Sequence, residues 1–171
     1  MKTYKNNRSA ANLRVAIVAA RWNDLFTSRL VDGAVETLIS LGADPENIEI
    51  LRVPGAFELP LVCRHAALSG RFDAVVALGV VIRGETPHFD YVAGEAARGI
   101  AEASRETGVP IAFGVVTANT TEQAADRCGL KAGNKGAEAA ISAVETANLL
   151  RQAGFVKSDR DTSAKAVSNV V

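Results

Sequence analysis

The 171-residue sequence is poor in the residues that build disulfide frameworks and metal centres, with only two cysteines and two histidines. Cys63 and Cys128 fall in separate helical patterns, and no Cys-x-x-Cys pair occurs. We therefore expect two buried thiols rather than a disulfide. The same scarcity predicts that no metal is bound.

Charge of one sign and long apolar runs are missing as well. The 19 basic and 19 acidic side chains cancel, which argues against a nucleic-acid groove or a polybasic membrane surface. No apolar run approaches the ~20 residues that a membrane span requires. The amino terminus is polar and lacks the apolar core of a signal peptide. We expect a cytoplasmic protein that binds neither nucleic acid nor membrane.

Three common sequence motifs are absent too. No Gly-x-Gly-x-x-Gly follows the first apolar strand, which argues against a dinucleotide-binding fold. No Gly-x-Ser-x-Gly elbow of a hydrolase occurs. The glycine-rich residues 129–136 do not follow a strand and do not fit a phosphate-binding P-loop. The chemistry must therefore come from another constellation.

What the sequence does contain is a regular alternation of apolar runs and helical patterns. Strands are expected at residues 14–20, 48–53, 74–82 and 109–117. Helices are expected at about residues 26–41, from residue 56 onward, and at 87–106, 119–127 and 137–151. This order predicts an α/β fold, in which a parallel sheet carries helices on both faces and the crossovers are right-handed.

The chain is long enough for one domain with a sizeable core. Residues 14–156 carry the whole strand and helix pattern and would form that domain. The polar residues 1–13 would form an amino-terminal arm. Residues 157–171 mix Ser, Asp, Lys and Thr without a period, so we expect a disordered tail.

The most informative stretch is residues 74–91. Nine apolar residues suit a strand buried on both faces, and they stop abruptly at Arg83-Gly84-Glu85. Thr86 is expected as the N-cap of the next helix and Pro87 as its first residue. A strand, a glycine loop and a helix start together make an anion site. His88 lies on the same turn and could exchange protons with a bound ligand.

The carboxyl ends of the other strands point to the same place. In an open α/β sheet, ligands bind outside those ends. The rule selects four segments, at residues 22–23, 54–58, 80–88 and 113–119. They contribute two aromatic platforms, a carboxylate, an imidazole and the helix start. Together they predict a pocket for a planar, hydrogen-bonding ring and a phosphate.

Each of these side chains also has a purely structural interpretation. Trp22 could belong to the core, and Glu58 could serve only the N-terminus of its helix. Thr86 could be only a cap, and His88 a surface histidine. Arg127 could be a solvated residue near a helix end. Taken one by one, the residues leave these alternatives open.

Four motifs lie in the order and spacing of a known family. They are Arg21-Trp22-Asn23, Pro54-Gly55-Ala56-Phe57-Glu58, the run Gly-x-x-Ile-Arg-Gly-x-Thr-x-His from Gly79, and Gly133-Asn134-Lys135-Gly136. From about residue 14 to residue 151, the sequence resembles the lumazine synthases (6,7-dimethyl-8-ribityllumazine synthases). The resemblance implies a three-layer, flavodoxin-like sandwich with a four-stranded parallel sheet.

The resemblance also implies a reaction. Members condense 5-amino-6-(D-ribitylamino)uracil with 3,4-dihydroxy-2-butanone 4-phosphate to 6,7-dimethyl-8-ribityllumazine, and release phosphate and water. This transferase step is the penultimate one of riboflavin biosynthesis and needs no cofactor. Two alternatives remain: a riboflavin-binding or storage protein with little catalysis, and a phosphosugar enzyme on the same fold.

By the same resemblance, His88 is the catalytic proton-transfer residue. Glu85, Thr86 and Arg127 would bind the phosphate, and Phe113 would close the site from a neighbouring subunit. The residues implied to bind the ribitylaminouracil are Trp22, Asn23, Ala56, Phe57, Glu58, Val80, Val81, Ile82, Phe113 and Lys135. Trp22 stands where phenylalanine is common, and an indole keeps the stacking surface.

Family resemblance further implies a homo-oligomer. Members form pentamers with active sites between subunits, and some build sixty-subunit shells. The arm at residues 1–13 would then add to a neighbouring subunit's sheet and cover an exposed strand edge. Riboflavin synthase is the candidate protein partner.

Overall fold

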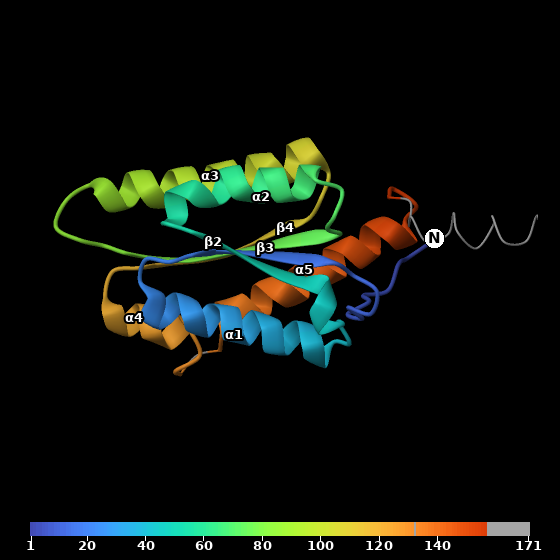
Figure 1. Cartoon of the computed structure of the whole chain (residues 1–171), viewed down its shortest axis with the longest axis horizontal. Coiled ribbons are helices and arrows are strands. Elements are labelled where there is room, and N and C mark those ends of the chain that lie inside the picture. Colours follow the sequence, from blue (N-terminus) through green and yellow to red (C-terminus); the bar gives the residue numbers. More distant parts are fainter. Residues whose placement is uncertain (132, 157–171) are drawn as a thin grey trace, which may run out of the picture.

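A four-stranded sheet forms the centre of the protein (Figure 1). The structure is a computed structural model and describes residues 1–131 and 133–156. The strand order is β2-β1-β3-β4, and every neighbouring pair is parallel. The strands are β1 (Val15–Ala20), β2 (Ile48–Val53), β3 (Ala74–Ile82) and β4 (Ile111–Ala118).

Helices cover both faces of this sheet. In Figure 1, α2 and α3 lie above it, and α1, α4 and α5 lie below. The helices are α1 (Asp24–Ser40), α2 (Leu59–Leu68), α3 (His88–Thr107), α4 (Thr121–Arg127) and α5 (Lys135–Gln152), with short 3-10 turns η1 (Pro45–Asn47) and η2 (Ala56–Glu58). This is a flavodoxin-like, three-layer arrangement, so the predicted fold class is confirmed.

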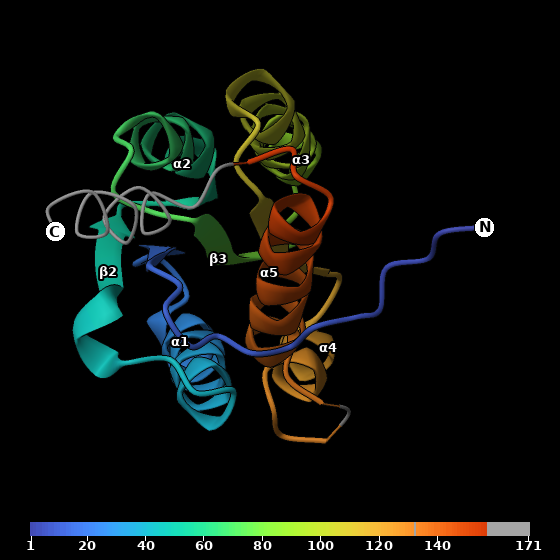
Figure 2. The ribbon, with the colours of Figure 1, turned by 90° about the vertical axis from the view of Figure 1, so that its right-hand side faces the viewer.

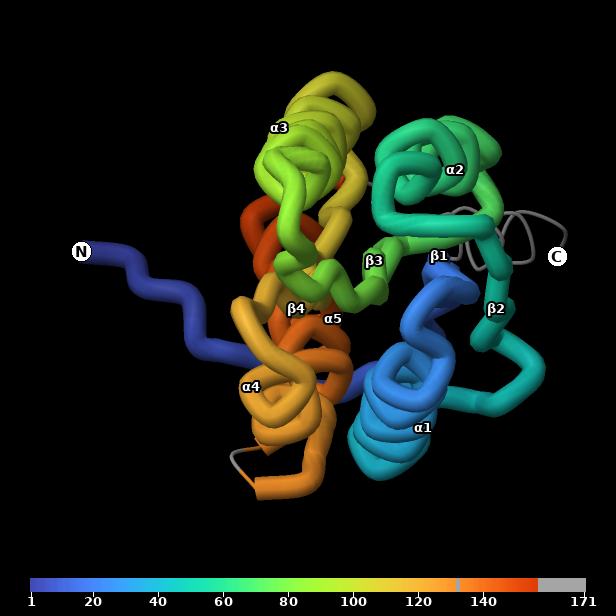
Figure 3. The backbone as a smooth tube through the Cα atoms, turned by 90° about the vertical axis from the view of Figure 1, so that its left-hand side faces the viewer, coloured from blue at the N-terminus to red at the C-terminus, as the bar shows by residue number. Residues whose placement is uncertain are grey.

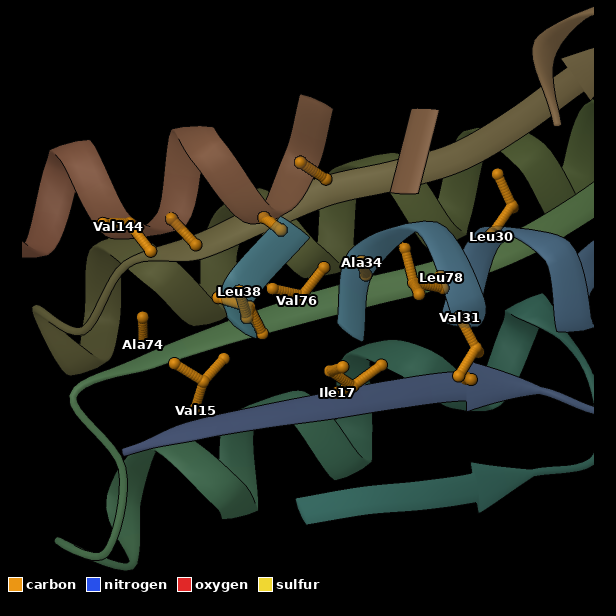
Figure 4. Packing of buried hydrophobic residues seen from close by; sticks show 14 of the residues in the cluster. Val15, Ile17, Leu30, Val31, Ala34, Leu38, Ala74, Val76, Leu78 and Val144 are labelled. Carbon is orange, nitrogen blue, oxygen red and sulfur yellow. The ribbon is translucent and has the colours of Figure 1, made fainter. Parts of the chain in front are cut away.

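The two central strands are apolar along their length because both of their faces are covered. All six residues of β1 and the first seven of β3 are buried. Side chains alternate between the faces, so Val15, Ile17 and Val76 pack toward α1 and α5 (Figure 4). Their neighbours Ala16 and Val18 pack toward α2 and α3. The apolar runs of the sequence are thus the signature of a sheet buried on two sides.

The starts of α3 and α4 differ from the expectation. The N-cap residue of α3 is Pro87, and the side chain of Thr86 makes no capping hydrogen bond. The first turn is closed instead by the main chain, where the Asp90 N–H donates to the Pro87 carbonyl at 3.0 Å. At α4 the helix was expected from residue 119, but it begins at Thr121 with Thr120 as its N-cap. Thr120 has the extended backbone that an N-cap needs, and its hydroxyl accepts from the Gln123 N–H at 3.2 Å.

The last part of the polar arm is tied to α5. The Asn148 amide donates to the carbonyls of Asn7 and Ser9, both at 2.9 Å, and Arg8 pairs with Glu145 at 2.6 Å. Ala10 is fully buried. Figure 2 shows the chain crossing α5 and then running away from the sheet toward the amino terminus. The predicted tail at residues 157–171 lies outside the described residues.

Both cysteines are free and buried, as expected from the sequence. Burial raises the pKa of Cys63 to about 12. Burial also raises the pKa of Cys128 to about 11, although the nearby Arg29 charge opposes the shift. Both thiols are therefore almost entirely protonated at neutral pH. In the described residues, no helix is long and apolar enough to cross a bilayer.

We expect the native protein to resist thiol reagents at pH 8. With these pKa values, only about one thiol in 10³ or fewer is ionised there, and neither sulfur is accessible. An absorbance assay with an aromatic disulfide should detect almost no reactive thiol per chain. In denaturant the same assay should detect both. Fast titration of one thiol in the native state would contradict the burial.

Candidate active site

The carboxyl ends of β1 and β3 lie side by side, and the chain leaves them toward opposite faces of the sheet (Figure 3). From β1 it enters α1, and from β3 it enters α3. Ligands of open α/β sheets bind at such a topological switch point. A cavity of about 220 Å³ lies here, lined by Ala20, Trp22, Asn23, Ala56, Val80, Val81, Ile82, Gly84, Thr86, His88, Phe89 and Val92.

One wall of the cavity is the end of β3, which continues past its neighbour β1. Pairing with β1 stops at Leu78, whereas pairing with β4 continues to Ile82. The Asn23 amide donates to the Val80 carbonyl at 2.8 Å, so this carbonyl faces the β1 side. Main-chain groups alternate in direction along a strand, so those of Ile82 face the same way. Ile82 can therefore offer main-chain hydrogen bonds to a ligand.

Trp22 stands at the mouth of the cavity with 63% of its surface exposed. The main-chain N–H of Trp22 donates to the Pro54 carbonyl at 3.0 Å, and this bond ties the turn after β1 to the turn after β2. The indole lies against Gly55, where a Cβ atom would come within 2.6 Å of the ring. Gly55 is therefore needed to seat the indole. Gly55 belongs to one of the four motifs of the sequence, but its role in seating the indole was not predicted.

The segment after β2 contains three residues predicted to bind substrate, and only one of them lines the cavity. Ala56 is buried and lines the cavity, whereas Phe57 is 57% exposed and does not. One carboxylate oxygen of Glu58 accepts from the Gly55 N–H at 2.9 Å. One oxygen of Glu58 therefore has the purely structural role of a residue at a helix start. This bond also holds Gly55 beneath the indole.

The loop between β3 and α3 is the most open part of the site. Thr86 and His88 line the cavity, and Glu85 lies just outside its lining. Within the described part of the chain, the side chains of Glu85, Thr86 and His88 make no hydrogen bond. His88 is the first residue of α3, where unsatisfied N–H groups and the helix dipole favour an anion. A phosphate and an imidazole can therefore meet on this turn.

Three further predicted residues, on β4, α4 and α5, do not reach the cavity of their own chain. Phe113 lies on the edge strand β4 and is 47% exposed. Arg127 is the exposed last residue of α4. Lys135 begins α5 and pairs with Glu138 at 2.5 Å. None of them lines the cavity.

Other lining residues went unnoticed in the sequence. Phe89 and Val92 belong to α3 and lie three residues apart, the spacing of one helix face, which is the signal that could have identified them. Of the described residues, no cluster of three His, Cys, Asp or Glu side chains could hold a metal ion. The site thus offers an aromatic platform, main-chain hydrogen bonds, an anion-binding turn and one imidazole.

Comparisons with known proteins agree with this geometry. A family model described as 6,7-dimethyl-8-ribityllumazine synthase matches residues 12–151. The chain is similar to relatives with that name from three bacteria. The protein of Chlorobium chlorochromatii (strain CaD3) is 57% identical over 144 residues, which cover 84% of this chain and 93% of the relative.

The protein of Syntrophus aciditrophicus (strain SB) is 56% identical over 143 residues, which cover 84% of this chain and 93% of the relative. That of Chloroherpeton thalassium (strain ATCC 35110 / GB-78) is 53% identical over 152 residues, which cover 89% and 98%. Identity at this level extends over almost the whole of each relative, and the matched residues include every element of the sheet. The chain therefore belongs to the 6,7-dimethyl-8-ribityllumazine synthase family.

Proposed function

We propose that the protein is a transferase that forms 6,7-dimethyl-8-ribityllumazine for riboflavin biosynthesis. It condenses 5-amino-6-(D-ribitylamino)uracil with 3,4-dihydroxy-2-butanone 4-phosphate and releases phosphate and water. Apart from family membership, one observation supports this proposal. A single cavity at the switch point brings an exposed indole together with an open phosphate-sized turn and a histidine.

The cavity walls suit the two substrates. The pyrimidine ring stacks on Trp22, and the open main-chain edge of β3 at Ile82 binds its polar rim. Asn23, Ala56, Phe57 and Glu58 hold the ribityl chain and ring at the mouth. The phosphate of the second substrate binds at Glu85 and Thr86, by the loop N–H groups and the start of α3. The two reactants then meet over His88.

Proton transfer is the chemistry that remains. The amine attacks the ketone and loses water to form an imine. Phosphate elimination requires a proton to leave the adjacent carbon. In ring closure the ribitylamino nitrogen then bonds to the remaining carbonyl carbon, whose oxygen takes up protons and leaves as a second water. An imidazole exchanges protons near neutral pH and suits these steps. Because both substrates are already reactive, holding them together contributes strongly as well.

Direct measurement of the reaction tests the proposal. The purified protein, mixed with both substrates, should form ribityllumazine and inorganic phosphate in equal amounts. Riboflavin titration tests the flavin-storage alternative, which predicts strong quenching of flavin fluorescence by Trp22 but no lumazine. Binding of sugar phosphates without the pyrimidine would instead indicate a phosphosugar enzyme. Either result, in a protein that forms no lumazine from the two substrates, would overturn the synthase assignment.

The complete site is proposed to lie between two copies of the chain. A cavity of about 220 Å³ is smaller than the roughly 300–1,000 Å³ of typical ligand sites. Its indole is 63% exposed, and a neighbour would cover it. We propose that the neighbour contributes Phe113, Arg127 and Lys135, which do not reach the cavity of their own chain. Repeated head-to-tail contacts of this kind close into a ring, which for this family is a pentamer.

Mixing two inactive variants should restore activity if the site is shared. His88→Ala and Arg127→Ala chains, coexpressed in equal amounts, place an intact pair of residues at about a quarter of the interfaces of a mixed ring. We therefore expect about a quarter of wild-type activity per site, measured by lumazine formation. Activity no higher than the mean of the separate variants would place both residues in one chain's site.

A larger assembly is proposed as well. The amino-terminal arm would add to a neighbouring subunit's sheet. Pentamers would join into a sixty-subunit shell. Riboflavin synthase would be its protein partner. Light scattering would distinguish a pentamer from a shell by their masses.

A further inference from the structure

The phosphate-binding loop is held at its two ends rather than along its length. Gly84, Glu85 and Thr86 are exposed, and a Cβ atom on Gly84 would meet no other atom within 4 Å. The ends are Arg83, which follows β3, and the first turn of α3. A loop without internal contacts keeps its shape only if these ends keep a constant separation.

Arg83 joins the two ends. Its N–H donates to the Ala118 carbonyl at 2.9 Å, which extends the β3–β4 ladder by one residue. Its guanidinium donates to both carboxylate oxygens of Asp90, at 2.8 and 3.1 Å. Asp90 lies in the first turn of α3, one residue beyond Phe89. The side chain therefore bridges the loop that its own main chain begins.

Two further contacts fix the plane of this guanidinium. Its Nε–H donates to the Asn119 side-chain carbonyl at 3.1 Å, in the connection between β4 and α4. Its carbon lies 4.1 Å from the centre of the Phe89 ring, which lines the cavity. A cation over an aromatic face is attracted by the ring electrons. The same group thus orients a cavity wall.

We propose that Arg83 is a positioning residue for the phosphate-binding loop, acting through Asp90, Phe89 and Asn119. The inference rests on the proposed function and adds a residue to it. Arg83 does not line the cavity, so it acts on Thr86 and His88 by setting where the turn between them lies. The hydrogen bond with Arg83 also lowers the pKa of Asp90, which favours the ionised carboxylate of this pair.

The contact geometry requires arginine. A guanidinium is flat and has N–H groups in a rigid fork, so it can bind two carboxylate oxygens and a third acceptor in one plane. The lysine ammonium keeps the charge but has no fork and no flat face to lie on Phe89. Because the ion pair is exposed, its loss should change stability little. Its effect should fall on the position of the loop.

The test replaces Arg83 with lysine in the complete, assembled protein. We expect KM for the butanone phosphate to rise about 10-fold and kcat to fall about 10-fold, because small displacements of reacting groups are costly. KM for the ribitylaminouracil should change by less than about 2-fold, and the melting temperature by no more than about 4 °C. The dissociation constant of inorganic phosphate, from 31P NMR titration, should rise about 10-fold.

Matched variants separate this role from a general structural one. Arg98→Lys alters an exposed arginine of α3, the helix that also carries Asp90. Arg98 pairs with Glu95 and Glu102, and its replacement by lysine should leave both phosphate binding and activity as in wild type. Asp90→Asn should weaken phosphate in the same direction as Arg83→Lys. Combining Arg83→Lys with Asp90→Asn should cost little more than Arg83→Lys alone, since both break one contact. Asp90→Asn also serves if Arg83→Lys does not fold.

The outcomes distinguish the inference from the proposed function. Unchanged phosphate binding and an unchanged KM in Arg83→Lys would overturn the positioning role, even in an active synthase. Equal losses for both substrates, with a large fall in melting temperature, would also overturn it. If wild type forms no lumazine but Arg83→Lys weakens phosphate binding 10-fold, the synthase assignment fails and the positioning role stands.

Discussion

Replacing His88 with alanine is expected to lower kcat by about 10²–10⁴-fold, the usual contribution of a general acid–base residue. His88 is the first residue of α3 and lines the cavity, and its side chain serves no other group among the described residues. The loss should therefore appear in the chemical step. KM for either substrate should change little, and steady-state rates of lumazine formation measure both quantities.

The chain offers a matched control, because its one other histidine is His65 on α2. His65→Ala should keep wild-type kcat. A kcat within about 3-fold of wild type in His88→Ala would leave positioning alone as the source of catalysis.

Replacing Gly136 with alanine is expected to destabilise the fold by about 3 kcal/mol or more. Gly136 lies in the first turn of α5, where that helix crosses α1. A Cβ atom there would lie 2.0 Å from the carbonyl oxygen of Leu30, and this oxygen belongs to the main chain of α1. A main-chain atom cannot rotate aside, so the two helices would have to separate.

Urea unfolding at a fixed protein concentration measures this change, because oligomer stability depends on concentration. Gly94→Ala is the control. Gly94 lies inside α3, and a Cβ atom there would contact nothing within 4 Å. It should gain about 0.5–1 kcal/mol from helix propensity. Similar midpoints for Gly136→Ala and wild type would mean that α1 and α5 can move apart without cost.

The sequence predicted the two central strands, β1 and β3, well because they are buried on both faces. The expected bounds of residues 48–53 and 74–82 agree with β2 and β3. A continuous apolar run such as that of β3 leaves little choice of structure, whereas β2 includes Glu49 and Arg52 and was bounded by the turn residues that follow it. The alternation of strands and helices then determined the parallel α/β class. The carboxyl-end rule selected three segments that meet at the cavity, and also residues 113–119, which do not line it.

Helix starts were predicted less well because several residues compete to cap them. The helix expected from residue 137 begins at Lys135, since the Asn134 side chain accepts from the N–H groups of Gly136 and Ala137. The Asn134 amide also donates to the Arg29 carbonyl at 2.8 Å, which no local pattern indicates. This contact between residues far apart in sequence holds Asn134 at the N-cap position of α5.

The sequence alone determined the fold class, the buried thiols and the stretch where an anion and an imidazole could meet, because these follow from hydrophobic pattern, composition and local turn chemistry. Only the tertiary structure decided which residues share a cavity. It placed the Trp22 indole on Gly55 and the Arg83 guanidinium across the loop between β3 and α3, and left Arg127 outside the cavity. The reason is physical: such contacts join residues whose separation in sequence is unrelated to their separation in space, and only packing brings them together.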